Sequence, residues 1–153
     1  MSDPIAPPAA RWPWQAPELV SLAVSDGDLG AAVAQYEHGA VLAPWADHET
    51  EAGTVRETMT KIMRLRLPLE TRLLAVLSAD GLTMLVCERR IEGAGPDGKL
   101  VRLCGVGSTV VRAQADGAWR IVVDAWRLTG TPDASPVAPA ASPSARRDID
   151  RQT

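Results

Sequence analysis

The residues best suited to chemistry lie in segment 105–126, GVGSTVVRAQADGAWRIVVDAW, which contains a hydroxyl, a carboxylate and an indole. Asp116-Gly117 between two apolar runs predicts a two-stranded hairpin. With the turn centred there, Thr109 lies opposite Asp124. Because side chains alternate between the two faces of a strand, Thr109, Asp124 and Trp126 share one side. We interpret this side as the floor of a small-molecule pocket.

Asp124 is the first candidate catalytic residue. A carboxylate on an apolar, concave sheet face could exchange a proton with a ligand near neutral pH. Gly105 and Gly107 lie on the same side and would leave room beside it, while Thr109 and Trp126 are candidate ligand-binding residues. The alternative is a structural role for Asp124, in a hydrogen bond at the end of the sheet or in a salt bridge. The possible ion-pair partners are Arg89, Arg90 and Arg112.

Glu88 and Arg90 are candidate ligand-binding residues whose position depends on strand register. If the turn at 95–98, Gly-Pro-Asp-Gly, is centred between its proline and aspartate, both side chains lie on the same side as Thr109. A slip of one residue turns them outward and brings Cys87 and Arg89 inward. The alternative role for Glu88 and Arg90 is a solvated or subunit-facing ion pair.

Tyr36 and His48 are the other candidate proton-transfer residues. Tyr36 either presents its hydroxyl to the pocket or anchors its helix to the sheet. His48 lies in an Asp-His-Glu segment, where a neighbouring acid can orient the imidazole as a general base; the alternative is an exposed loop histidine. The remaining candidate ligand-binding residues are apolar and would suit a core equally well. These are Trp45, Met59, Met63 and Met84.

The elements that must position these residues are helices followed by strands. We expect a first helix from Pro17 to near Gly27, a second from its Asp28 cap to Gly39, and a third from its Thr54 cap to about residue 66. A short strand at 40–45 separates the last two helices. Four further strands are expected at 69–78, 83–91, 100–113 and 118–128. This order predicts an α+β domain, a cone in which three N-terminal helices pack on a strongly curved, mostly antiparallel sheet.

Composition limits the class of protein. The 153 residues suffice for one domain with a real core, 46% are hydrophobic, and the net charge of −3 with no basic stripe argues against nucleic-acid binding. We expect a Pro/Trp-rich arm at 1–16, the cone domain at 17–130 and a disordered tail at 131–153. No apolar run is long enough to cross a membrane and no export signal is recognisable. The two cysteines are therefore expected to be reduced thiols in a cytoplasmic protein, with no metal site and no cofactor.

Several motifs resemble the nuclear transport factor 2-like superfamily. They are Gly-Asp-Leu at 27–29, Tyr36-x-x-x-Ala40-Val41, the Gly-Pro-Asp-Gly turn and DGAWRIVVDAW at 116–126. The chain looks most like the small SnoaL-like and ketosteroid-isomerase-like proteins of bacteria, a group that includes proteins encoded beside polyketide and enediyne biosynthetic genes. The resemblance covers about residues 17–129. It implies the cone fold but not one activity, because the superfamily contains isomerases, cyclases, dehydratases, epoxide hydrolases and non-catalytic domains.

When the resemblance is carried over residue by residue, the catalytic residues of ketosteroid isomerases are not found in this chain. Ketosteroid isomerases use a carboxylate base with an oxyanion hole of tyrosine and protonated aspartic acid. The base position matches Pro44, the tyrosine position matches Val20, and the aspartic acid position matches Thr109. Tyr36 matches a supporting tyrosine and Trp126 a pocket-wall tryptophan. The chain has no asparagine, so the water-positioning set of limonene-type epoxide hydrolases is also incomplete.

Three functions remain open on the sequence. The first is a cofactor-independent enzyme that cyclises, isomerises or dehydrates a hydrophobic, polyketide-derived intermediate. The second is a binding, sequestering or self-resistance protein with the same pocket. The third is an association domain. In each case the outer sheet face is expected to form a homodimer, because it would otherwise expose an apolar set. The set is Val106, Val110, Ile121 and Val123.

Overall fold

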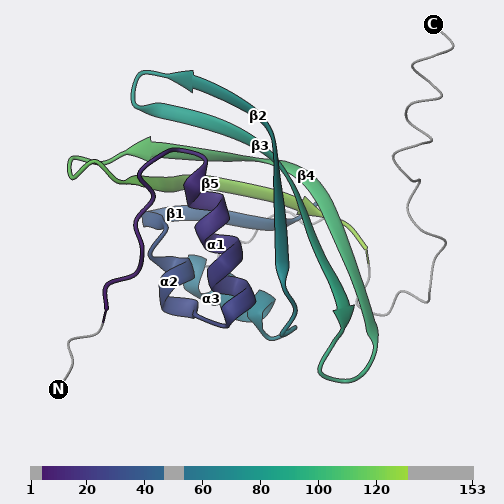
Figure 1. Cartoon of the computed structure of the whole chain (residues 1–153). Coiled ribbons are helices and arrows are strands. Elements are labelled where there is room, and N and C mark those ends of the chain that lie inside the picture. Colours follow the sequence, from purple (N-terminus) through teal and green to yellow (C-terminus); the bar gives the residue numbers. More distant parts are fainter. Residues whose placement is uncertain (1–4, 47–53, 131–153) are drawn as a thin grey trace, which may run out of the picture.

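The computed structural model describes residues 5–46 and 54–130. It has the expected α+β architecture, in which helices pack inside a curved five-stranded sheet of order β1-β5-β4-β3-β2 (Figure 1). The elements are α1 (Gln15–Asp26), α2 (Leu29–Val33), β1 (Tyr36–Trp45), α3 (Val55–Met63), β2 (Leu69–Ala79), β3 (Leu82–Ala94), β4 (Leu100–Ala113) and β5 (Trp119–Leu128). No helix in the described ranges is long and apolar enough to span a membrane. The expected tail at 131–153 and the Asp-His-Glu segment that contains His48 lie outside the described residues.

The predicted caps at Gly27, Asp28 and Thr54 are confirmed, although α1 begins two residues before the expected Pro17 and α3 ends at Met63 rather than near residue 66. Gly27 ends α1 with φ 74°, a left-handed conformation that favours glycine. The Thr54 hydroxyl accepts a hydrogen bond from the Glu57 N–H at 3.2 Å and so caps α3. Asp28 caps α2 in the same way, through the Ala31 N–H at 3.0 Å. The caps therefore fix the start of both later helices.

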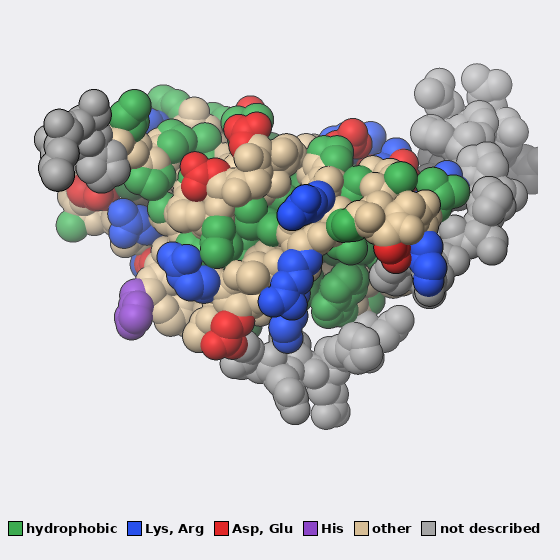
Figure 2. Space-filling model, turned by 90° about the horizontal axis from the view of Figure 1, so that it is seen from below, with side chains coloured by type: hydrophobic (Ala, Val, Ile, Leu, Met, Phe, Trp, Pro, Cys, Tyr) green, Lys and Arg blue, Asp and Glu red, His purple; other side chains and the backbone are tan. Residues whose placement is uncertain are grey.

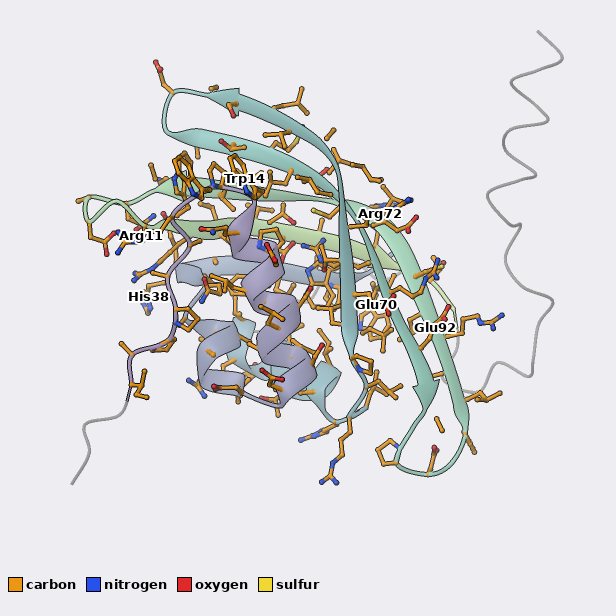
Figure 3. The ribbon with its side chains drawn as sticks, viewed as in Figure 1. Arg11, Trp14, His38, Glu70, Arg72 and Glu92 are labelled. Atoms are coloured by element: carbon orange, nitrogen blue, oxygen red, sulfur yellow. The ribbon has the colours of Figure 1, made fainter. Side chains whose placement is uncertain are left out.

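The expected end of the second helix is wrong. The helix stops at Val33, and Tyr36 is the first residue of β1 rather than a helical residue. The cause is pairing with β5: the Gln35 carbonyl accepts a hydrogen bond from the Ile121 N–H at 2.8 Å, and β1 then runs parallel to β5. His38, expected at a helix C-terminus, is therefore an exposed strand residue at the margin of the fold (Figure 3).

The register of β3 on β4 is one residue away from the register that would bring Glu88 and Arg90 inward. Arg89 pairs with Gly105 and Cys87 with Gly107, so both face the helices. The loop explains the difference. Gly98, with φ 80°, adds a left-handed residue after the tight turn, and the Gly95 N–H bonds the Lys99 carbonyl at 2.8 Å.

The register of β4 on β5 brings Thr109 opposite Asp124, as expected. A β-bulge makes this possible. Val111 pairs with Ile121 while Val110 pairs with Val123, so one residue of β5 is unpaired between them. The bulge also turns Ile121 into the core, where it is fully buried, so its expected place on the outer face is wrong.

The N-terminal arm lies against the fold over the part that is described. The Trp119 N–H donates to the Ala10 carbonyl at 2.9 Å, and Ala10 is fully buried. The Gln35 side chain donates to the Pro8 carbonyl at 2.7 Å. Trp12 and Trp14 stack on each other with ring centroids 5.8 Å apart, and both remain largely exposed. The arm therefore forms a single antiparallel bridge with the start of β5 before α1 begins.

Candidate functional site

The inner face of the sheet contains a buried polar cluster centred on Asp124. Asp124 is fully buried, and each of its two oxygens accepts a hydrogen bond. The Tyr36 hydroxyl donates to Oδ2 at 2.7 Å, and the Thr109 hydroxyl donates to Oδ1 at 2.7 Å. Both partners are donors, which is the pattern that suits an ionised carboxylate, since it can only accept. The register of three strands thus brings three polar side chains together in one buried place.

Arg89 completes the cluster from β3. Its Nη2 donates to the Thr109 hydroxyl at 2.8 Å and lies 3.3 Å from Asp124 Oδ1. Its guanidinium carbon lies 5.1 Å from the centre of the Trp126 ring, a cation–π contact. Arg89 is 1% exposed and Trp126 is fully buried. The guanidinium is therefore held between an indole and a carboxylate, out of reach of bulk solvent.

Three atoms of this cluster have no hydrogen-bond partner. They are Arg89 Nε, Arg89 Nη1 and Trp126 Nε1, and no other buried side-chain nitrogen or oxygen in residues 5–46 and 54–130 is in this state. Buried donors without acceptors are rare because each one costs free energy of about 1–3 kcal/mol. All three belong to two side chains in direct contact, so the unsatisfied donors are concentrated at one point of the fold.

Burial keeps the neutral groups of the cluster protonated. The pKa of Tyr36 is raised well above its ordinary value of 10.0, first by burial and then by the charge and hydrogen bond of Asp124, while Arg89 opposes the shift. The pKa of the Cys87 thiol is also raised, chiefly by burial, with Arg89 again opposing. Tyr36 is therefore a phenol whose proton is committed to Asp124, and Cys87 is a neutral thiol.

Apolar residues flank the cluster within the same rows of the sheet. Leu42 of β1 pairs with Asp124, and Leu85 of β3 pairs with Thr109, so one row across four strands reads Leu42, Asp124, Thr109, Leu85. Both leucines are at most 1% exposed. The cluster is thus a polar point within an apolar inner face.

The glycines of β4 have a different role from the expected one. A Cβ on Gly107 would collide with the Ala125 carbonyl oxygen, and a Cβ on Gly105 would collide with that of Arg127. Both clashes are with backbone, which cannot move aside. Gly105 and Gly107 therefore allow close approach of β5, rather than making room for a ligand.

The remaining candidate residues are divided among several places. Met59 is fully buried and Met63 is partly buried against the core, both on α3. Trp45, at the end of β1, is 39% exposed. Met84 lies on the outer sheet face, because its neighbours Thr83 and Leu85 occupy the inner one. His48 lies outside the described residues.

Glu88 and Arg90 are not part of the cluster. Both lie on the outer face, where Glu88 pairs with Arg72 at 3.4 Å and Arg90 lies 3.7 Å from Glu92. Arg72 on β2 and Glu92 on β3 are labelled in Figure 3. On the face seen in Figure 2, basic, acidic and apolar side chains are interspersed. The cause of the difference is the one-residue register shift described above.

Arg89 is the residue that sequence reasoning did not place among the site candidates. From the sequence, Arg89 was considered only as a possible ion-pair partner of Asp124 and as a residue that would face inward if the register slipped by one residue. The available signal was the pair Arg89-Arg90 itself, since alternation on a strand must turn one of two neighbouring arginines inward. Deciding which one required the geometry of the loop at 95–99.

The positions that match ketosteroid isomerase residues do not rebuild its site. Val20 is 1% exposed in α1 and Pro44 is buried in β1, and neither carries a polar side chain. Thr109 lies at the centre of the cluster but is used to connect Arg89 with Asp124. The polar atoms of the cluster without a partner are N–H donors of Arg89 and Trp126, so the arrangement can offer hydrogen bonds to oxygen acceptors.

Solved structures identify the fold. A conserved protein from Planctomyces limnophilus superposes with a TM-score of 0.67 at 11% identity, over 76% of this chain and 92% of that one. A ketosteroid isomerase-like protein from Erwinia carotovora atroseptica gives 0.63 at 12%, over 78% and 95%. A protein from Streptomyces avermitilis, provisionally described as a dehydratase from the NTF2-like family, gives 0.63 at 17%, over 77% and 94%. The chain therefore has the NTF2-like fold that the sequence motifs indicated.

Sequence comparison adds no activity to this result. No known family profile matches the chain, and no curated protein matches it. At 11 to 17% identity the structural neighbours establish the fold alone. What the chain does must therefore be argued from its own residues.

Proposed function

We propose that this chain is a small-molecule-binding protein whose ligand sits against the buried cluster of Arg89, Trp126, Thr109 and Asp124. The observation that carries the proposal is the set of three buried N–H-bearing atoms without partners in an otherwise apolar inner face. Such groups are stabilised when a ligand supplies the missing acceptors. A polyketide-derived intermediate in the cytoplasm, as the resemblance suggests, fits this chemistry because it combines carbonyl or carboxylate oxygens with an apolar skeleton.

Binding is favoured over acid/base catalysis by the state of Asp124 and Tyr36. To accept a proton from a ligand, the buried Asp124 would have to give up a hydrogen bond from Tyr36 or Thr109. Tyr36 cannot act as a base near neutral pH, since its pKa lies well above 10.0. Both residues are better suited to fixing the position of Arg89.

The proposal includes a homodimer formed through the outer sheet face. One row of paired residues crosses all five strands and is entirely apolar. The row is Val41, Val123, Val110, Met84 and Leu77. Four of its members are between 38% and 54% exposed, and Val110 is partly buried. A sheet face of this kind is usually covered by a partner, and a second copy of the same row is self-complementary.

Ligand binding is tested with methyl naphthoate, a neutral aromatic ester that carries acceptor oxygens. At a concentration about 100 times its dissociation constant, a ligand stabilises the folded state by about 2.7 kcal/mol, which corresponds to a rise of roughly 5–10 °C in the thermal midpoint. In the NMR spectrum, the indole N–H signal of Trp126 is expected to move during the titration. The signals of Trp12 and Trp14, which are 57% and 45% exposed, serve as internal controls.

The proposal is overturned if neither the ester nor the corresponding acid changes the unfolding midpoint. It is also overturned if the signals of Trp12 and Trp14 move while that of Trp126 does not, since the ligand would then bind the exposed indoles of the N-terminal arm.

A further inference from the structure

Arg89 retains a nearly complete set of unused donors. A guanidinium has five N–H groups, of which Nε carries one and Nη1 carries two, so at least three of the five have no acceptor here. Nη2 carries the other two and donates one of them to Thr109. Whichever hydrogen Nη2 uses, the other lies beside an unpartnered nitrogen. One edge of the guanidinium therefore keeps two parallel N–H donors.

The indole of Trp126 adds a further donor at the same place. Its Nε1–H has no acceptor, and its ring lies against the guanidinium at 5.1 Å. Tyr36, Thr109 and Asp124 are already occupied with one another. The groups left for a ligand are thus donors only, and at least three of them carry the delocalised positive charge of Arg89.

We propose that the ligand of this site is a carboxylate joined to an apolar skeleton, with the carboxylate held by the free edge of Arg89 and by Trp126 Nε1. This inference rests on the proposed function and names the chemical class of the ligand. A carboxylate matches the forked edge of a guanidinium in two parallel hydrogen bonds and offers about four acceptor positions. A single carbonyl offers two and leaves buried donors unused. The apolar skeleton matches the leucines that flank the cluster, Leu42 and Leu85.

The position of Asp124 is compatible with a second anion. Among the nitrogens of Arg89, the ion pair to Asp124 is formed by Nη2, at 3.3 Å. Two hydroxyl donors also hold the charge of Asp124. Because the free edge includes the second hydrogen of Nη2, a ligand carboxylate there would share this nitrogen with Asp124, and the one guanidinium would pair with both anions. The two hydroxyl donors on Asp124 offset part of the repulsion between the carboxylates.

The test compares naphthoate with methyl naphthoate on the full chain, by calorimetric titration near neutral pH. The two probes share a ring system and differ in the charge and hydrogen-bonding capacity of one group. Hydrogen bonds to charged groups are stronger than neutral ones, so naphthoate is expected to bind about tenfold or more tightly than its ester. In the wild type, the Nε–H signal of Arg89 and the indole N–H signal of Trp126 should both move with naphthoate.

Two neighbouring arginines give the matched variants. Arg89→Met removes the inward donor set and is expected to abolish the preference for the acid, whereas Arg90→Met changes an outer-face residue and should leave it intact. Arg89→Lys keeps the charge but not the fork, and should lose most of the preference. If Arg89→Met fails to fold, the comparison of acid and ester in the wild type still decides the inference.

Equal binding of acid and ester would overturn the inference while leaving the proposed function standing, and so would tighter binding of the ester. Tight naphthoate binding that does not move the Arg89 and Trp126 signals would overturn it as well, since the carboxylate would then be held elsewhere. If neither probe binds, the proposed function itself fails.

Discussion

Arg89, Thr109, Asp124 and Tyr36 form one chain of hydrogen bonds in which Thr109 both accepts and donates. Thr109 accepts from the cation and donates to the anion, so it orients both. Tyr36 closes the other end. Buried networks of this kind are stabilising only when every member is satisfied, and this one is satisfied at the carboxylate and open at the guanidinium.

Tyr36 gives a direct test of this network, because it is the only tyrosine of the chain. The unfolded chain releases the phenol proton near pH 10.0, but the folded chain holds it to a higher pH. Between pH 10.0 and the higher pKa of the folded state, the folded state binds more protons than the unfolded state. The contribution of Tyr36 to stability is therefore complete below pH 10.0 and falls over this interval by about 1.4 kcal/mol per pH unit. Ultraviolet absorbance of tyrosinate, recorded with and without urea, should show the delay.

Tyr36→Phe is the control for that titration and should show no tyrosinate signal at all. A native protein that titrates at the same pH as the urea-unfolded chain would show that Tyr36 is not held in the cluster.

At the scale of single residues, the sequence prediction that Thr109 lies opposite Asp124 is confirmed, but it depends on a bulge that was not predicted, and the sequence did not select Arg89 over Arg90. The first prediction follows from an Asp-Gly turn between apolar runs. The second depends on whether a loop contributes an even or an odd number of residues, and one left-handed glycine at Gly98 decides it. Single-residue shifts of this kind exchange whole faces of a strand.

At the scale of elements, the two hairpins show why one predicted register is confirmed and the other is wrong. Gly98 and Gly117 both adopt positive φ, 80° and 85°, and both loops therefore contain one residue more than a simple two-residue turn. In β5 a bulge near Val122 compensates for the extra residue, and Thr109 meets Asp124. The pairing of β3 with β4 continues from Leu82 to Ala94 without a bulge, so its shift persists. Sequence pattern marks turns well, but it marks bulges poorly.

Close approach between β4 and β5 predicts that Gly107→Ala is strongly destabilising. The new Cβ would overlap the Ala125 carbonyl oxygen, and overpacking of a well-packed interior typically costs about 1–3 kcal/mol or more. The free energy of unfolding in urea measures the effect. Gly30→Ala is the matched control: its new Cβ would meet only Asp28 Oδ1, at 3.6 Å, and alanine is favoured over glycine in a helix by up to about 1 kcal/mol.

Equal stability of Gly107→Ala and the wild type would mean that β4 and β5 are further apart than this register requires.

The order of the elements, by contrast, could be predicted from caps, breakers and alternation alone. The start of β1 could not, because a parallel partner from the other end of the chain determines it.

At the scale of the whole molecule, the curved sheet has an apolar inner face, which the helices cover, and an outer face that carries ion pairs and one exposed apolar row. The helices cover the concave face (Figure 1). The row from Val41 to Leu77 remains on the other. The proposed ligand site and the proposed dimer interface lie on opposite faces of the sheet, so the two proposals can be tested independently.

The homodimer predicts a specific effect of charge on that row. Met84→Glu places a carboxylate at the middle of the proposed interface and is expected to convert a dimer to a monomer in sedimentation velocity at micromolar concentration. Leu22→Glu, on α1 and 56% exposed, should leave the dimer unchanged. A monomeric wild type, or a dimer that tolerates Met84→Glu, would refute the interface.

Gln35 connects the N-terminal arm to the polar cluster. Its side chain holds the Pro8 carbonyl, its own carbonyl holds β5, and the next residue along the chain is Tyr36, whose hydroxyl holds Asp124. Lifting the arm would leave a buried amide with only a long contact to the Ala31 carbonyl, at 3.4 Å. Proteolytic removal of the first ten residues is therefore expected to change the position of Tyr36, which follows Gln35 directly in the chain, and to weaken its hydrogen bond to Asp124. In this sense the N-terminal arm supports the polar cluster.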